Sequence, residues 1–148
     1  MLVKQLMKKR KNDLFTVSPE QTVAALIETL NKRHVGAMVV VDAHGVLQGI
    51  VSERAVLRVA YDQNTKTVDC SKTIGEIMRK RDDISTVTVN SRVREVMELM
   101  QKERTRHVIV VDDQGKAVTC LSVRDIVEQL LATIETENRE LQNFMYGY

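Results

Sequence analysis

Apolar residues recur at helical spacing in two segments of the chain. The first set is Val23, Leu26, Ile27 and Leu30, and the second is Val93, Val96, Met97 and Met100. Residues three and four positions apart lie on one face of a helix, so each set predicts an amphipathic helix with a buried face. A continuous apolar run follows each helix, at residues 37–41 and 108–111. Because polar residues do not alternate within these runs, they predict strands that are buried on both faces.

Each buried strand is followed by a turn and then by a second strand. The turns end in Gly45 and Gly115, and glycine accepts the positive φ that a tight turn needs. Second strands are expected at 46–51 and 117–121, so the centre of each segment is a hairpin.

Shorter elements complete the pattern on both sides of each hairpin. Ser52 and Ser122 are expected to act as N-caps of a last helix, and the second of these helices extends to about Leu141. The other expected elements are short strands at 15–17 and 85–89 and helices at 2–9 and 74–80.

The two segments are copies of one unit. Residues 14–57 align on residues 84–127 at a constant offset of 70, without a gap, and 11 of 44 positions are identical. One residue is inserted near Lys11, so the preceding helices align at an offset of 71. Neither half is expected to bury enough surface to fold stably alone. A duplication of this kind predicts two copies that stack around a shared core. The predicted organisation is a first repeat with its N-terminal helix (1–62), a polar linker (63–72) and a second repeat with a long C-terminal helix (73–148).

Composition and charge narrow the possible partners. The 148 residues are 43% hydrophobic and 28% charged, an ordinary globular balance, and 22 basic against 20 acidic residues leave a net charge of +2. Neither nucleic acid nor an anionic membrane is favoured by this balance. Basic clusters at 8–11 and 79–81 suit helix ends, and no aromatic residues interleave with them to stack on bases.

The chain offers no sign of export or membrane insertion. The longest apolar stretch is too short to span a bilayer, and the N-terminus does not lead into the apolar core of a signal peptide. Cys70 and Cys120 lack the spacing of metal or redox motifs. We expect reduced thiols in a cytoplasmic protein.

The duplicated order of strand, helix, strand, turn, strand and helix resembles the tandem cystathionine beta-synthase (CBS) domain pair, or Bateman module. The segments Val-Gly-Ala-Met-Val-Val-Val-Asp (35–42), Gly-Ile-Val-Ser-Glu-Arg (49–54) and Arg-His-Val-Ile-Val-Val-Asp (106–112) are similar to bacterial stand-alone CBS-domain proteins. The resemblance implies an α/β fold in which two β-α-β-β-α repeats pack sheet to sheet about a pseudo-twofold axis. It also implies two equivalent clefts for adenosine-containing ligands, and a homodimer.

The second copy carries the family's ligand motif as Leu-Ser-Val-Arg-Asp at 121–125. By resemblance, Asp125 binds the ribose hydroxyls, and Ser122 helps to position the sugar or the phosphate. Arg106 and His107 stand where the family often carries a basic pair for phosphates, and Arg124 is a second candidate cation. The residues expected to line the adenine side are Thr86, Val87 and Val108.

The first copy departs from this motif. Ala55 stands in place of the ribose-binding aspartate, and no basic pair begins the strand. The resemblance therefore implies a weaker second cleft, in which Ser52 and Arg54 hold a phosphate and Gly36 lets a ring approach the backbone. The other residues assigned to this cleft are Thr16, Val17 and Met38.

Structural roles are open for some of the same residues. Ser122 and Asp125 also fit a capping box, Ser-x-x-acid, although the third helical position is usually Glu or Gln. Arg106 and His107 also fit a solvated pair at the entry to a strand. For Ser122, a role as helix cap and a role in ligand binding are compatible.

The function that this pattern favours is regulatory. We expect a module that senses an adenine nucleotide, with AMP as first candidate and ADP, ATP or NAD(H) as others, and that signals in trans to an unknown effector protein. The alternative is a non-catalytic assembly protein with degenerate clefts. Enzymatic activity is disfavoured because the chain lacks the Gly-x-Ser-x-Gly elbow, a Walker loop, the Rossmann fingerprint and metal-ligand spacing.

Three of the five aromatic residues cluster at the C-terminus: Phe144, Tyr146 and Tyr148. One interpretation is that this segment docks on a partner subunit and supports a homodimer. The alternative is a frayed terminus.

Overall fold

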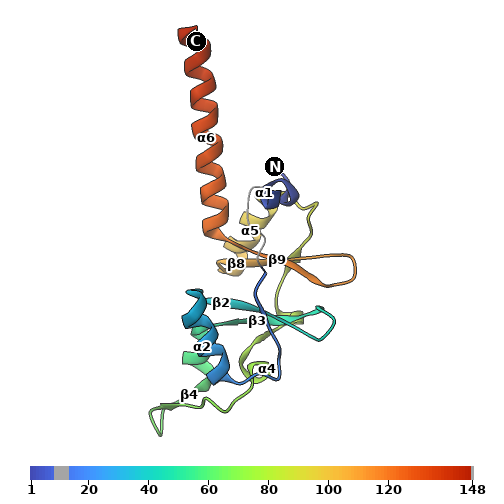
Figure 1. Cartoon of the computed structure of the whole chain (residues 1–148), viewed down its shortest axis with the longest axis vertical. Helices are drawn as coiled ribbons and strands as arrows, with labels where there is room; N and C mark the ends of the chain where they lie inside the picture. The colour runs from blue at the N-terminus through green and yellow to red at the C-terminus, as the bar shows by residue number, and fades with distance from the viewer. Residues whose placement is uncertain (9–13, 148) are drawn as a thin grey trace.

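The two repeats form separate sheets that lie one above the other in the computed structural model (Figure 1), which describes residues 1–8 and 14–147. The first sheet has the order β1-β2-β3-β6 and the second the order β7-β8-β9. Their strands are β1 (Thr16–Val17), β2 (Ala37–Val41), β3 (Leu47–Ser52), β6 (Arg79–Lys80), β7 (Thr86–Val87), β8 (His107–Val111) and β9 (Ala117–Ser122).

Both predicted hairpins are present. β2 pairs with β3 and β8 with β9, each antiparallel, and the first strand of each repeat runs parallel to the buried strand. Gly45 and Gly115 have φ values of 81° and 76°, as the turn sequences predict. The carboxylates of Asp42 and Asp112 accept backbone N–H groups within their turns. The central residues of β2 and β8 are buried, which confirms the reading of the unbroken apolar runs.

The amphipathic helices are α2 (Val23–Arg33) and α5 (Val93–Glu103), which cover the two sheets. Most of the predicted apolar positions on the two helices are buried. Ile27 is only partly buried, and the side chain of Met97 is 42% exposed and therefore does not belong to the core.

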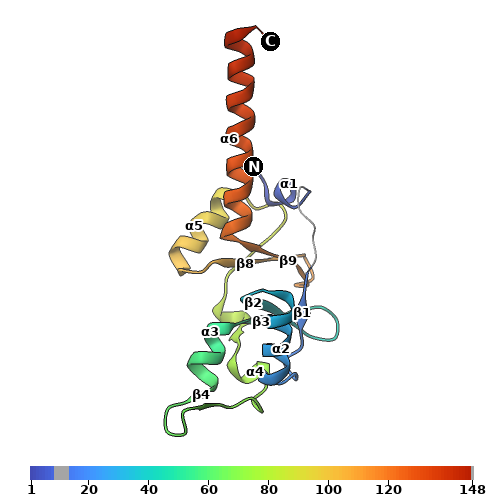
Figure 2. The same cartoon turned by 60° about the vertical axis from the view of Figure 1, so that its left-hand side comes forward.

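The last helix differs between the repeats. In the first it is short, α3 (Glu53–Ala55) followed by a π-helical turn, η1 (Val56–Ala60). In the second, α6 (Val123–Tyr146) has 24 residues and continues five residues beyond the expected end at Leu141. Figures 1 and 2 show α6 rising away from the rest of the molecule.

The short helix that precedes each repeat in the sequence packs on the other repeat. α1 (Val3–Lys8) packs in the core of the second repeat, where Val3 and Leu6 are buried with Val96 and Val108. The N–H of Val3 donates to the carbonyl of Ser91 at 2.9 Å. We grouped this helix with the first repeat by its place in the sequence, but it packs on the second repeat. The chain therefore crosses from one repeat to the other after α1. The basic residues 9–11 and the insertion near Lys11 lie outside the described residues, as does Tyr148.

The segment expected as a helix at 74–80 is helical only at its start. α4 (Ile74–Ile77) buries Ile74 and Ile77 in the first repeat's core, and then β6 pairs with β3 as an edge strand. A 3-10 turn, η2 (Arg81–Asp83), follows. The expected linker also contains structure, since β4 (Tyr61–Asp62) and β5 (Thr67–Val68) form a small hairpin.

The sheets meet through a third apolar cluster that draws on both repeats. Its buried members are Val39, Leu47, Ile109 and Val111. The two hairpin turns also pair across the contact: the N–H of Leu47 donates to Gly115 O and that of Ala117 to Gly45 O, each at 3.1 Å. These reciprocal contacts confirm sheet-to-sheet packing about a pseudo-twofold axis. Within the described residues, no helix is long and apolar enough to cross a membrane.

Candidate functional site

The start of the buried strand and the start of the last helix lie together in each repeat. In the second repeat, His107 is paired with Ser122 across β8 and β9, and the N–H of Val123 donates to the carbonyl of Arg106 at 3.0 Å. In the first, Ala37 is paired with Ser52 in the same way. Hairpin register therefore brings the predicted basic pair to the predicted ribose motif.

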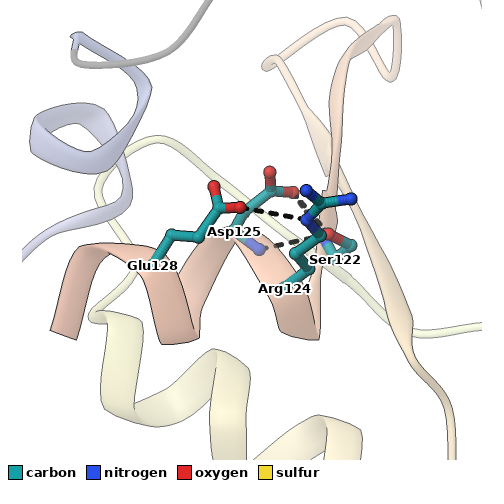
Figure 3. A network of polar contacts seen from close by, with 4 residues as sticks. All are labelled: Ser122, Arg124, Asp125 and Glu128. Carbon is teal, nitrogen blue, oxygen red and sulfur yellow. Dashed lines mark hydrogen bonds and ion pairs between the residues drawn. The ribbon is translucent and has the colours of Figure 1, made fainter. Parts of the chain in front are cut away.

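Ser122 and Asp125 form a complete capping box at the start of α6 (Figure 3). Asp125 Oδ2 accepts from the backbone N–H of Ser122 at 2.7 Å and from its hydroxyl at 2.8 Å. The hydroxyl oxygen accepts in turn from the N–H of Asp125 at 3.2 Å. The capping interpretation is confirmed, and these bonds hold the carboxylate in a fixed position at the helix start. Its contact with a ribose stays a prediction.

Arg124 and Glu128 lie beside this box on the same helix (Figure 3). Arg124 Nε donates to Glu128 Oε1 at 3.0 Å, and the two side chains are 86% and 62% exposed. An exposed pair of this kind is worth little to stability, so Arg124 can be redirected at small cost.

A cavity of about 850 Å³ lies next to the capping box and is lined from both repeats. The second repeat contributes the predicted residues Arg106, His107, Ser122, Arg124 and Asp125. The facing wall comes from the first repeat and is mostly apolar: Leu14, Phe15, Val35, Gly36, Ala37, Met38 and Val39. The cavity combines two carboxylates (Asp125 and Glu128), two arginines, the imidazole of His107 and an apolar surface in one space.

The three residues predicted for the adenine side do not line this cavity. Val87 and Val108 are buried in the core of the second repeat, and Thr86 pairs with Ile109 in the sheet and accepts a hydrogen bond from Arg81. Met38, which we assigned to the other cleft, lines the Asp125 cavity instead. The physical reason is that each cleft lies between repeats, so the wall opposite the motif comes from the other copy.

A second cavity, of about 490 Å³, lies at the equivalent place in the first repeat. Ser52 and Arg54 line it as predicted, with Ala55 where the second repeat has Asp125. Thr16 and Val17 do not line it: Thr16 is exposed on β1, and Val17 is buried in the first core. Gly36 lines both cavities, and so do Ala37, Arg106 and His107.

The second cavity is strongly basic. Its lining contains five arginines and one glutamate: Arg54, Arg58, Arg79, Arg104, Arg106 and Glu53. Sequence reasoning identified only Arg54 and Arg106 as candidates. Arg58 follows Arg54 by four positions, a helical spacing that offered a signal, whereas Arg79 and Arg104 reach the cavity through contacts distant in sequence.

The environment of His107 lowers the pKa of its imidazole below the usual 6.5. Burial is the largest cause, the positive charge of Arg106 adds to it, and the carboxylate of Asp125 opposes both. The imidazole is therefore neutral at pH 7. Within the described residues, no group of three or more His, Cys, Asp or Glu side chains is placed to hold a metal ion.

This pKa predicts a pH dependence of stability. Between the lowered pKa of folded His107 and the value of 6.5 for the unfolded chain, the unfolded state binds more protons, so the free energy of unfolding falls as pH falls through that window. Urea unfolding between about pH 7.5 and 5.5 is expected to show a smaller loss for His107→Gln than for the natural chain. Equal pH profiles for the two proteins would exclude His107 as the source.

The structure is therefore a module of two tandem α/β domains, with one cavity at the start of the last helix of each domain. The chain belongs to the CBS domain family, whose model matches residues 3–62 and 74–132. It is 30% identical over 130 residues to the mitochondrial CBS domain-containing protein CBSX3 of Arabidopsis thaliana, an alignment that covers 86% of this chain and 62% of that protein. The chain thus spans under two thirds of that relative's length.

Two solved structures show the same fold. The CBS-domain protein ATU1752 of Agrobacterium tumefaciens is 29% identical, with a TM-score of 0.75 over 87% of this chain and 98% of the other. The CBS domain pair of protein MJ0100, solved in complex with 5'-methylthioadenosine and S-adenosyl-L-methionine, is 26% identical, with a TM-score of 0.74 over 90% of this chain and 98% of the other.

Proposed function

We propose that the protein is a regulatory module that binds an adenine nucleotide in the Asp125 cavity and signals in trans to an effector protein. AMP is the first candidate ligand, with ADP, ATP and NAD(H) as others. The observation that carries the proposal is the convergence of Asp125, Arg106 and His107 on one cavity of about 850 Å³ with an apolar facing wall. The proposed role is not enzymatic. The cytoplasm is the proposed compartment.

The parts of a nucleotide correspond to the parts of this cavity. A carboxylate accepts from two ribose hydroxyls at once, which suits Asp125 at the start of α6. The guanidinium of Arg106 suits a phosphate, and the apolar wall with Val35, Met38 and Val39 suits a purine ring. The adenosine compounds bound by the MJ0100 domain pair support this class of ligand.

The second cavity suits phosphate groups better than ribose. Ala55 offers no acceptor for the sugar hydroxyls, whereas the five arginines supply donors for anionic oxygens. A ligand there is proposed to be held by its phosphates, more weakly and with greater sensitivity to salt than in the Asp125 cavity.

Calorimetric titration with AMP, ADP, ATP, NADH and S-adenosylmethionine tests the proposal. One site per chain, lost on substitution of Asp125, supports a sensor that works through the second repeat. A second, salt-sensitive site supports phosphate binding in the arginine-rich cavity. Absence of binding by a folded protein that carries no nucleotide would contradict the proposal and favour the assembly role, which the loss of the aspartate at position 55 also favours.

Substituting Arg106 is expected to separate phosphate from nucleoside recognition. Arg106→Ala should weaken binding of AMP about tenfold and change binding of adenosine little, because only AMP presents a charged group to the guanidinium. Arg94→Ala is the matched control, since Arg94 is an exposed arginine that pairs with Glu98 and does not line the cavity. Equal losses for AMP and adenosine would show that Arg106 does not meet the phosphate.

A further inference from the structure

Helix α6 leaves most of its apolar side chains uncovered. Ile126 is buried at its base, but beyond the second turn the helix rises clear of both sheets (Figures 1 and 2). Its 24 residues extend about 36 Å. Ile134 and Leu141 are 51% and 57% exposed, and Phe144 is 89% exposed. A long amphipathic helix gains most of its stability from packing, so this face calls for a partner.

The exposed residues follow a coiled-coil repeat. Spacings of four and three alternate without interruption along one stripe, here called the α6 seam: Val123, Val127, Leu130, Ile134, Glu137, Leu141 and Phe144. An average spacing of 3.5 keeps a seam facing a second helix, whereas 3.6 suits a single straight helix on a globular surface. The repeat therefore specifies another helix as the partner. Glu137 is the one charged position in the seam.

An apolar groove lies at the base of the same seam. It has a volume of about 510 Å³ and runs between α5 and α6. Val123, Val127 and Leu130 line it from the seam, and Met97 lines it from α5. This accounts for Met97, whose helical spacing places it with the core residues although its side chain is 42% exposed.

We propose that the partner of the α6 seam is the α6 helix of a second copy of the chain, running antiparallel to the first. In an antiparallel coiled coil, each a position of one helix faces a d position of the other helix. In the register that gives the two helices their longest overlap, the numbers of two facing residues add to 271. Ile134 then faces Glu137 of the second copy, Leu130 faces Leu141, and Val127 faces Phe144. The apolar end of each helix arrives at the groove at the base of the other.

Glu137 decides between the two orientations. In a parallel pair in register, Glu137 would face its own copy inside the seam, and two like charges in one layer are destabilising. In the antiparallel pair, each Glu137 lies beside Ile134, and the two carboxylates are in different layers. The helix dipoles also oppose one another favourably in this orientation.

The seam and the groove favour a second copy over an unrelated helix because they are complementary to each other. A single twofold axis, midway between Leu130 and Leu141 along the helix, brings the C-terminal end of each seam to the groove of the other copy. Such isologous contacts are the commonest basis of homodimers. Without a partner, the aromatic residue Phe144 stays 89% exposed. The proposal is independent of nucleotide binding.

Sedimentation equilibrium of the full chain tests the dimer. A mass near twice the 16.8 kDa of one chain is expected at micromolar concentration. Ile134→Glu and Leu141→Glu should each raise the dimer dissociation constant about tenfold or more, because each places a charge in an apolar layer. Ala132→Glu adds the same charge outside the seam and should leave the dimer intact. A monomeric natural chain, or equal effects of all three substitutions, would overturn the proposal.

Cysteine crosslinking tests the orientation. In a background carrying Cys70→Ser and Cys120→Ser, neither Leu130→Cys nor Leu141→Cys should crosslink with itself on mild oxidation. A mixture of the two variants should give a disulfide-linked heterodimer. Self-crosslinking of Leu141→Cys would show a parallel seam and overturn the antiparallel pairing. Both cysteine positions lie on the exposed face of α6, so the fold of the two repeats should be unaffected.

Discussion

Replacing Asp125 by alanine is expected to weaken binding of AMP at least tenfold. A charge-assisted hydrogen bond contributes about 1.5–3 kcal/mol, and the loss of one such bond is enough for a tenfold change. The equivalent position in the first repeat is already alanine, so the same substitution makes the two clefts alike at this point. Calorimetric titration of AMP into both proteins measures the change. Unaltered affinity would remove Asp125 from the site.

The capping box requires a second variant for this test. Asp125 Oδ2 accepts two hydrogen bonds from Ser122, so Asp125→Ala also removes part of the cap of α6. Loss of a cap costs about 0.5–2 kcal/mol of stability. Asp125→Asn keeps a carbonyl oxygen for the cap and removes the charge. If both variants lose affinity and only the alanine variant loses stability, the binding effect belongs to the carboxylate and not to the helix end.

Local patterns predicted the elements of each repeat. Val39 and Val40 lie in an unbroken apolar run, which identified a buried strand, and Gly45 and Gly115 marked the hairpin turns. These features depend on neighbours within about ten residues, and the duplication supplied each of them twice. The capping interpretation of Ser122 was correct for the same reason, because an N-cap is a contact three residues along the chain.

Contacts between distant segments were not predictable in this way. Nothing in the sequence of residues 2–8 distinguishes packing on the first repeat from packing on the second, and the structure places Val3 and Leu6 on the second. The clefts present the same difficulty. A pattern within one repeat identifies Asp125, but it cannot show that Met38 of the other repeat forms the opposite wall.

The change from helix to strand after Ile77 also depends on a distant residue. Arg79–Lys80 pairs with β3 at Gly49 and Ile50, and this edge pairing carries Arg79 to the second cavity. At Gly49 a Cβ atom would overlap the carbonyl oxygen of Arg79 and lie 3.1 Å from Met78 Sδ. The close approach of β6 to β3 is therefore possible only with glycine at position 49.

Gly49→Ala is expected to destabilise the protein by about 1–3 kcal/mol, because a backbone oxygen cannot move aside without separating β6 from β3. Urea unfolding measures the loss. Gly36→Ala is the matched control: its Cβ would meet only the flexible end of Glu53, at 3.4 Å, and stability should change little. The separated strand should also withdraw Arg79 from the second cavity, so phosphate binding there should weaken while AMP binding at Asp125 persists. Equal stability of the two glycine variants would show that β6 does not pack against Gly49 as described.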